Sequence, residues 1–272
     1  MFAVRVLTAA ALLAGFFAAL LLLDRWLFAV LVGAIVGYAA REWAVLAGMN
    51  ARQALAYAAG CALSYAALTG WLWPVAVAAV PVLAILAAAL FFWGVAVPCW
   101  LVRGVSLASR KSLAVAGAAI LLPAAVAMIA LPPMPLVAVL GLVWTADTSA
   151  YLAGRALGRH RLAPAVSPGK TWEGVAGALL ASLAYAVILA LFIPGVGSYV
   201  KGMFWIPYLA GAAVLCVSDI LGDLFESAVK RRAGVKDSGA LLPGHGGVLD
   251  RIDSATAVLP LGALLFSWFG AA

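Results

Sequence analysis

The chain has 272 residues, of which 67% are hydrophobic and only 10% are charged, and its mean hydropathy is +1.14. About a quarter of the residues of an ordinary soluble domain are charged, so this composition excludes a soluble globular protein and indicates an integral membrane protein. The formal net charge of +7 suits anionic ligands or an anionic membrane surface.

Continuous apolar runs follow one another along the chain, each close to the roughly 20 residues that a helix needs to cross a bilayer. They lie at 4–23, 26–46, 51–69, 75–97, 112–131, 136–154, 174–193, 204–224 and 252–270. A barrel strand would alternate apolar and polar residues over about ten positions. We therefore predict an all-α polytopic membrane protein with about nine transmembrane helices. Residues 1–135 are predicted to form a lipid-facing scaffold and residues 136–272 to carry cytoplasmic catalytic loops.

The positions of the basic residues predict the orientation of the chain, because Lys and Arg near the ends of spans favour the cytoplasmic side. With nine spans and a cytoplasmic N-terminus, fifteen of the 17 basic residues fall on the cytoplasmic face. Only Arg25 and Lys201 fall on the other face. We therefore predict that the N-terminus is cytoplasmic and that the C-terminus lies outside.

The first candidate site residue in chain order is Asp147, near the end of a predicted span, with Tyr151 one helical turn later. An aspartate at membrane depth is costly unless it faces a polar cavity, so it is a candidate for a functional site. A carboxylate that only pairs with Arg155 is the alternative at this point.

The following loop, residues 154–173, is strongly basic and ends in Ser-Pro-Gly-Lys-Thr. This ending resembles the tail of a phosphate-binding P-loop but lacks the first glycine of that motif. Ser167 and the proline after it suit the start of a helix instead, where free amide groups attract anions. Lys170 would add a positive charge there.

Six of the ten acidic residues lie between Ser218 and Asp253. A stripe along one helical face, at spacing i, i+4, i+7 and i+11, consists of Asp219, Asp223, Glu226 and Lys230. Like charges this close repel one another, and carboxylate oxygens are the ligands that Mg²⁺ binds. The alternative is a helix end held by salt bridges to Lys230 and Arg231.

A second acidic pair, Asp250 and Asp253, begins the last span, so two helices are predicted to present carboxylates to one place. The loop before it is rich in glycine, whose backbone can approach a ligand closely. Carboxylates for a divalent metal beside Lys and Arg for phosphoryl oxygens are what phosphoryl or nucleotidyl transfer requires. The other candidate groups of this segment are Lys230, Arg231, Lys236, Asp237, His245, Gly246, Gly247 and Arg251.

These residues carry a resemblance to a known family. The signature of the phosphatidate cytidylyltransferases, also called CDP-diacylglycerol synthases, is similar to Ser227-x-x-Lys230-Arg231, Lys236-Asp237 and Leu242-Pro243-Gly244-His245-Gly246-Gly247-Val248-Leu249-Asp250-Arg251-Ile252-Asp253. Residues 147–151, 167–174 and 218–227 also resemble motifs of that family.

The resemblance implies transfer of the cytidylyl group of CTP to phosphatidate, giving CDP-diacylglycerol and pyrophosphate, at the cytoplasmic face of the cell (inner) membrane. It also implies Mg²⁺ as cofactor, with a second cation such as K⁺, and a homodimer; no nucleic-acid partner is expected. The metal role falls first on Asp223 and Asp250, with Asp219 and Asp253 as supporting ligands. The predicted catalytic residues are Asp223, Asp250, Lys230, Lys236, His245 and Arg251. The predicted substrate-binding residues are Lys170, Thr171, Arg231, Asp147, Ser167, Gly246, Gly247 and Asp237.

Two other classes of membrane protein fit part of this pattern. A transporter or channel would distribute its acids through several spans at mid-depth, whereas these gather at the predicted cytoplasmic border. An enzyme that consumes a CDP-alcohol would carry an Asp-Gly-x-x-Ala-Arg segment followed by two further aspartates at i+4 steps, and this segment is absent from the sequence.

Overall fold

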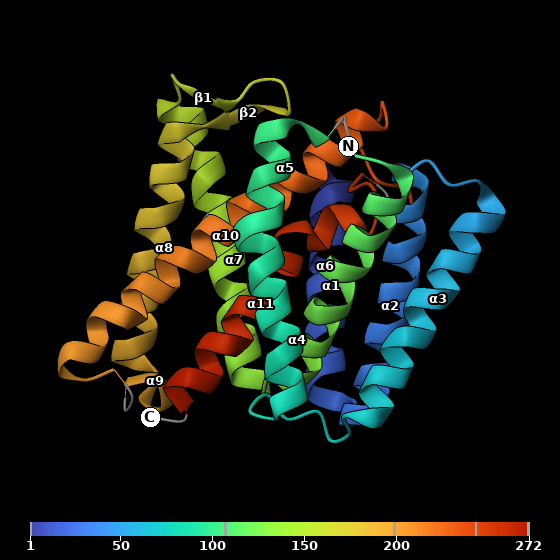
Figure 1. Cartoon of the computed structure of the whole chain (residues 1–272). Coiled ribbons are helices and arrows are strands. Elements are labelled where there is room, and N and C mark those ends of the chain that lie inside the picture. The colour runs from blue at the N-terminus through green and yellow to red at the C-terminus, as the bar shows by residue number, and fades with distance from the viewer. Residues whose placement is uncertain (1, 106–107, 198–199, 243, 271–272) are drawn as a thin grey trace.

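The computed structural model describes residues 2–105, 108–197, 200–242 and 244–270, in which long helices stand side by side in one bundle (Figure 1). The helices are α1 (Phe2–Leu22), α2 (Arg25–Leu46), α3 (Ala51–Trp71), α4 (Val80–Phe91), the π-helix η1 (Phe92–Ala96), α5 (Val97–Arg103), α6 (Arg110–Ala130), α7 (Pro133–Leu157), α8 (Trp172–Phe192), α9 (Pro194–Gly197), the 3-10 helix η3 (Gly202–Phe204), α10 (Trp205–Arg232) and α11 (Leu249–Gly270). Two strands, β1 (Arg161–Ala163) and β2 (Ser167–Thr171), form a hairpin at one end of the bundle.

The predicted helical membrane architecture is confirmed. Six helical segments of the described chain are long and apolar enough to cross a membrane: Arg25–Leu46, Val80–Arg103, Arg110–Ala130, Pro133–Leu157, Trp172–Phe192 and Gly202–Arg232. The other three predicted runs lie in α1, α3 and α11. Length and composition alone do not establish a span for these three, so the count of nine stays a prediction.

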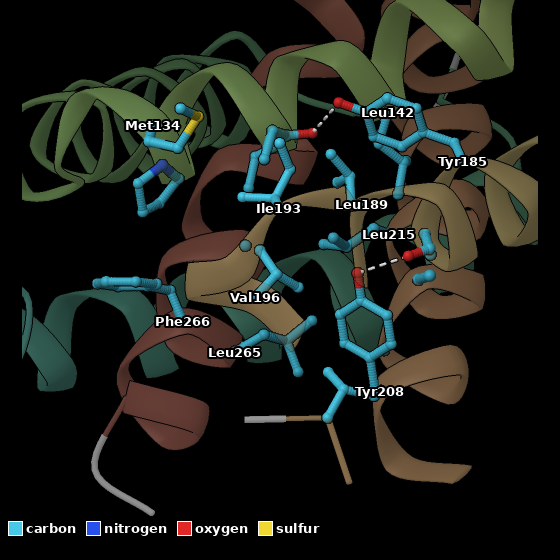
Figure 2. Close-up of a pocket in the computed structure, with 18 residues that line it drawn as sticks. Met134, Leu142, Tyr185, Leu189, Ile193, Val196, Tyr208, Leu215, Leu265 and Phe266 are labelled. Atoms are coloured by element: carbon cyan, nitrogen blue, oxygen red, sulfur yellow. Dashed lines mark hydrogen bonds between the residues drawn. The ribbon is translucent and has the colours of Figure 1, made fainter. Parts of the chain in front are cut away.

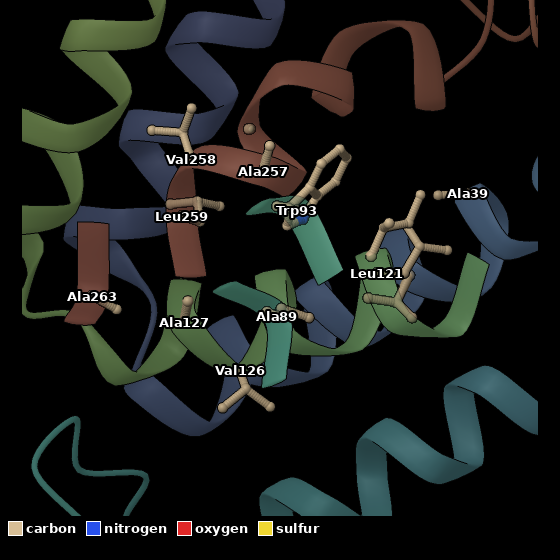
Figure 3. Packing of buried hydrophobic residues seen from close by; sticks show 14 of the residues in the cluster. Ala39, Ala89, Trp93, Leu121, Val126, Ala127, Ala257, Val258, Leu259 and Ala263 are labelled. Carbon is tan, nitrogen blue, oxygen red and sulfur yellow. The ribbon is translucent and has the colours of Figure 1, made fainter. Parts of the chain in front are cut away.

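Small residues allow the helices to pack closely in the centre of the bundle. Ala39, Ala127, Ala257 and Ala263 are completely buried, and Figure 3 shows them on α2, α6 and α11 in one apolar cluster, together with Trp93. Helices inside a bilayer have no hydrophobic driving force for association, because the lipid tails are as apolar as their side chains. They associate largely through such close packing. This core fixes α11 against α6, α4 and α7, and so sets the position of the acids at its first turn.

An aromatic cluster supports α10 next to its acidic stripe. The ring of Phe225, which is 1% exposed, is surrounded by Trp43 of α2, by Phe92 and Trp93 of η1, and by Trp100 of α5, with centroid separations of 5.7 to 6.3 Å. Aromatic pairs at this spacing contribute packing beyond their buried area. Helices from the first half of the chain therefore pack against α10 at Phe225, the residue before Glu226.

The segment between α7 and α8 differs from the prediction. A helix start at Ser167 and Pro168 is wrong, because this stretch is strand β2, which pairs antiparallel with β1 so that Ala163 faces Ser167. A proline is tolerated there because each strand of a two-stranded sheet is an edge strand. The cap of α8 is Thr171, whose Oγ1 accepts the N–H of Gly174 at 3.1 Å.

Replacing Thr171 by Ala is expected to lower the free energy of unfolding by about 1 kcal/mol, the usual contribution of an N-cap hydroxyl. The loss should appear as a lower thermal midpoint of the detergent-solubilised protein. Thr171→Ser keeps the hydroxyl and is the matched control. Equal midpoints for the Ala and Ser variants would contradict the capping role.

Candidate active site

A polar hollow of about 330 Å³ lies between α7, α10, α11 and the loop that joins α10 to α11. It is at the end of the bundle where α1 begins and where the β1–β2 hairpin lies (Figure 1). Its lining consists of Asp147, Asp223, Ser227, Lys230, Arg231, Lys236, Asp237, Asp250, Arg251, Asp253 and Ser254. All of these except Ser227 and Ser254 are predicted site residues, and the structure brings acids of α7, α10 and α11 together here.

The α10 stripe divides into a part that lines the hollow and a part that is buried beside it. Asp223 and Lys230 line the hollow, together with Ser227 and Arg231 on the same side of the helix. Asp219 is 3% exposed, lies one turn deeper in the bundle, and has an oxygen without a hydrogen-bond partner in the described structure. The predicted supporting metal ligand Asp219 is therefore not part of the lining.

Asp223 forms an ion pair with a lysine of the hairpin. Its Oδ2 is 2.7 Å from the Nζ of Lys170 on β2, and its Oδ1 accepts the hydroxyl of Ser227 at 3.1 Å. The side chains of Lys170 and Asp223 are 24% and 30% exposed, so the pair is accessible to water. The hairpin is further tied to α10 because the Nε of Arg231 donates to the carbonyl of Val166.

Asp250 is held by four donors at the start of α11. Its Oδ1 is 2.7 Å from the Nζ of Lys230, while its Oδ2 accepts the N–H of Gly247 at 2.8 Å and both the N–H and the hydroxyl of Ser238 at 2.8 and 3.0 Å. Charge-assisted bonds of this kind are the strong ones. Asp250 therefore holds the glycine-rich loop in place, and both oxygens of its carboxylate accept hydrogen bonds.

Lys230 bridges two acids rather than standing free. Its Nζ lies 2.7 Å from Asp250 and 3.4 Å from Glu226, and their side chains are only 11%, 5% and 3% exposed. Buried charges must be paired, because desolvation is expensive. The alternative interpretation of the stripe as a salt-bridged helix end thus holds for Lys230, whereas Asp223 remains open to the hollow.

Asp147 lines the hollow from α7 and does not pair with Arg155 in the described structure. The Nη1 of Arg155 donates instead to the hydroxyl of Tyr151 at 3.1 Å. Of the two alternatives for Asp147, the structure supports an acid that faces a polar cavity.

Several predicted residues lie outside the lining. His245 is one: its N–H donates to the carbonyl of Leu242, and its Nδ1 has no partner in the described structure. Ser167 and Thr171 belong to β2, where Thr171 caps α8. Gly246 and Gly247 are in the loop, where an added side chain on either would collide with the carboxylate of Asp250 or of Glu42. These two glycines therefore make room for carboxylates of the protein itself.

The sequence did not predict the lining residues Ser227 and Ser254, nor Glu42, which lies beside the hollow and binds its loop. Glu42 lies on α2, is 4% exposed, and contacts the loop more than 190 residues away in the chain. The available signal was an acid inside the apolar run 26–46, which is as costly at membrane depth as Asp147.

The donor chemistry of the hollow fits a hard divalent cation such as Mg²⁺. Asp147, Asp223 and Asp253 line one space and offer oxygen ligands, and the ammonium of Lys170 already occupies a cation position on Asp223. The described residues contain no ready-made group of three or more metal-binding side chains. In proteins Mg²⁺ is usually bound by one or two carboxylates together with substrate phosphates.

A second, apolar cavity of about 380 Å³ lies near the opposite end of α7, α8, α10 and α11, beside α9. Figure 2 shows its two tyrosines turned to backbone carbonyls: the hydroxyl of Tyr185 donates to Ala138 at 3.1 Å and that of Tyr208 to Ala186 at 2.9 Å. The remaining labelled side chains, such as Leu189 and Phe266, are apolar, and Met134 adds a thioether sulfur. This cavity is separate from the polar hollow and suits only an apolar occupant.

The sequence profile of the cytidylyltransferase family matches residues 3–269. The chain belongs to this family. A phosphatidate cytidylyltransferase of Pseudomonas aeruginosa is 42% identical over 272 residues, which cover 96% of this chain and 95% of that protein. Phosphatidate cytidylyltransferases of Haemophilus influenzae and Staphylococcus haemolyticus are 52% and 46% identical over 47% and 44% of this chain, and over 42% and 44% of their own lengths. The predicted family is confirmed, and with it that the protein is an enzyme of the nucleotidyltransferase class.

Proposed function

We propose that this family member transfers the cytidylyl group of CTP to phosphatidate and releases pyrophosphate, forming CDP-diacylglycerol. The observation that carries the proposal is the hollow in which Asp147, Asp223 and Asp253 lie beside Lys236 and Arg251. Two polyanionic substrates that must approach each other need such cations. The names of the similar proteins support phosphatidate as the acceptor.

The proposed reaction is a direct displacement. A phosphate oxygen of phosphatidate attacks the α-phosphorus of CTP in line, the new P–O bond forms as the bond to the β-phosphate breaks, and pyrophosphate leaves with the electron pair. The phosphate is already anionic near neutral pH, so no covalent enzyme intermediate is required. Lys236 and Arg251 offset the repulsion between the two substrates, and positioning supplies much of the remaining rate.

Mg²⁺ would neutralise phosphoryl charge when bound. Asp223 and Asp253 are the side chains best placed to hold it. All three acids line the hollow, but Asp223 is paired with the partly exposed Lys170, whereas Asp250 is bound by the buried Lys230 and by the loop. We therefore propose Asp223 as the leading ligand, with Asp250 shaping the site around it. A second cation such as K⁺ remains part of the proposal.

We propose nine spans in the cell (inner) membrane, with the hollow on the cytoplasmic side. The alternation of long helices, with α1 beginning at the hollow end and α11 finishing at the opposite end, supports an odd number of spans (Figure 1). Labelling with an impermeant thiol reagent tests this, using Arg110→Cys and Lys201→Cys in a background without the native cysteines. The homodimer implied by the resemblance would be tested by light scattering of the same preparations.

The activity is tested with purified protein in detergent, labelled CTP and phosphatidate. Labelled CDP-diacylglycerol should appear with Mg²⁺, and EDTA should reduce its formation by on the order of 10²-fold or more, the scale of a lost electrostatic group. A transporter would form no labelled lipid, and an enzyme that consumes CDP-alcohols would degrade added CDP-diacylglycerol instead. Absence of product with Mg²⁺ present would overturn the proposal.

A further inference from the structure

Glu42 is a buried carboxylate from the first half of the chain that binds the loop before α11. Its Oε2 accepts the N–H of Leu249 at 2.8 Å and the hydroxyl of Ser238 at 3.1 Å, and its Oε1 accepts the N–H of Val248 at 3.2 Å. These contacts join residues separated by 196 to 207 positions. Burying a carboxylate on an apolar helix costs free energy unless the group is hydrogen-bonded. These hydrogen bonds of Glu42 offset that cost.

The charge of Glu42 is compensated by the N-terminal end of α11. Within the described residues no lysine, arginine or histidine forms an ion pair with it, and two of its partners are the N–H groups of Val248 and Leu249 at the first turn of that helix. Those amides have no partner within their own helix, and the helix dipole favours a negative charge beside them. Glu42 therefore caps α11 from a different helix.

The same contacts lead directly to Asp250. The hydroxyl of Ser238 lies between the two carboxylates, 3.1 Å from Glu42 and 3.0 Å from Asp250, and it has a single proton to offer them. Gly247, which donates its N–H to Asp250, has its α-carbon against the carboxylate of Glu42. The loop is thus wrapped around two acids, one from α2 and one from α11.

We propose that Glu42 is a positioning residue, which fixes Ser238 and residues 247–249 of the loop and through them the orientation of Asp250 and its neighbours on α11. The proposal rests on the function given above, since its purpose is to hold the hollow in the form needed for cytidylyl transfer. Glu42 itself does not line the hollow and touches no substrate in this role. Residues 1–135 then supply more than a lipid-facing scaffold.

Two variants separate the charge of Glu42 from its shape. Glu42→Ala removes all three accepted bonds. Glu42→Gln keeps one acceptor oxygen but turns an NH₂ group toward an N–H donor, so an intermediate effect is expected. Arg41→Ala is the matched control, because Arg41 is the neighbouring residue on α2 and its side chain is exposed.

The test combines hydrogen exchange of the metal-free protein with steady-state kinetics. Amides of residues 247–249 and Ser238 should exchange about tenfold faster in Glu42→Ala, the scale of one lost hydrogen bond, while those of the β1–β2 hairpin stay unchanged. The kcat should fall roughly 10- to 100-fold, and the Mg²⁺ concentration for half-maximal activity should rise by a similar factor, as for other groups that orient a ligand. A smaller folded fraction alone would not move that Mg²⁺ midpoint.

Wild-type exchange in Glu42→Ala, or exchange that rises equally in loop and hairpin, overturns the positioning role. If Glu42→Ala does not fold, Glu42→Gln and Ser238→Ala carry the same comparison, with faster loop exchange expected in both. The exchange result does not depend on which substrates are used. An inactive wild type with a loosened Glu42→Ala loop would therefore count against the proposed function alone.

Discussion

Asp223→Asn is expected to reduce CDP-diacylglycerol formation on the order of 10²- to 10³-fold while leaving the protein folded. The substitution removes the negative charge that the proposed Mg²⁺ would bind, and a lost electrostatic group in an active site has effects of this size. The ion pair with Lys170 that is also lost is partly exposed, and such pairs contribute at most about 1 kcal/mol to stability. Activity and the thermal midpoint should be measured on the same sample.

Asp250→Asn should be equally inactive but less stable, because its amide would face the N–H groups of Gly247 and Ser238 that the carboxylate now accepts. Asp223→Asn is therefore the cleaner test of metal binding. Asp24→Asn removes an exposed acid at the opposite end of the bundle and serves as control. Wild-type turnover in Asp223→Asn would remove the metal assignment.

Lys230→Met is expected to destabilise the protein by about 3–5 kcal/mol, because it leaves Glu226 and Asp250 as buried acids without their shared cation. In a chain of this size each kcal/mol lowers the thermal midpoint by roughly 2–4 °C. The midpoint of the detergent-solubilised variant, compared with that of the exposed control Lys111→Met, measures the effect.

Adding Glu226→Gln to Lys230→Met should recover part of the loss, since it removes one of the two uncompensated charges. Asp250 would keep its bonds from Gly247 and Ser238. An unchanged midpoint in the single variant would mean that Lys230 is free for substrate, as the sequence alone had suggested.

The helices and the place where the candidate site residues meet followed from the sequence, because both depend on local patterns. Apolar runs predict the helices, and acids such as Asp147 and Asp223 near the ends of those runs predict a polar site at the ends of the helices. Once the helices pack, these ends meet. The family resemblance rested on the same residues.

The hydrogen-bond and ion-pair partners of the site residues were not predictable, because they depend on contacts between distant segments of the chain. Lys230 and Asp250 read as a free cation and a free metal ligand, yet they bind each other across the glycine-rich loop. The hairpin was missed because Ser-Pro is also a common helix start, and only the pairing of β2 with β1 settles the matter. Glu42 lies too far from the loop in the chain for any local pattern to link them.

The contact between Lys170 and Asp223 has a consequence for how the hollow would be loaded. Both oxygens of Asp223 are in use, one by the ammonium of Lys170 and one by the hydroxyl of Ser227. Under the proposed chemistry a divalent ion bound at Asp223 would compete with the ammonium of Lys170 for the same carboxylate, because two cations on one acid repel each other. A Lys170 side chain released from Asp223 would stay attached to the hairpin and would offer its positive charge to the phosphates of the nucleotide beside the hollow.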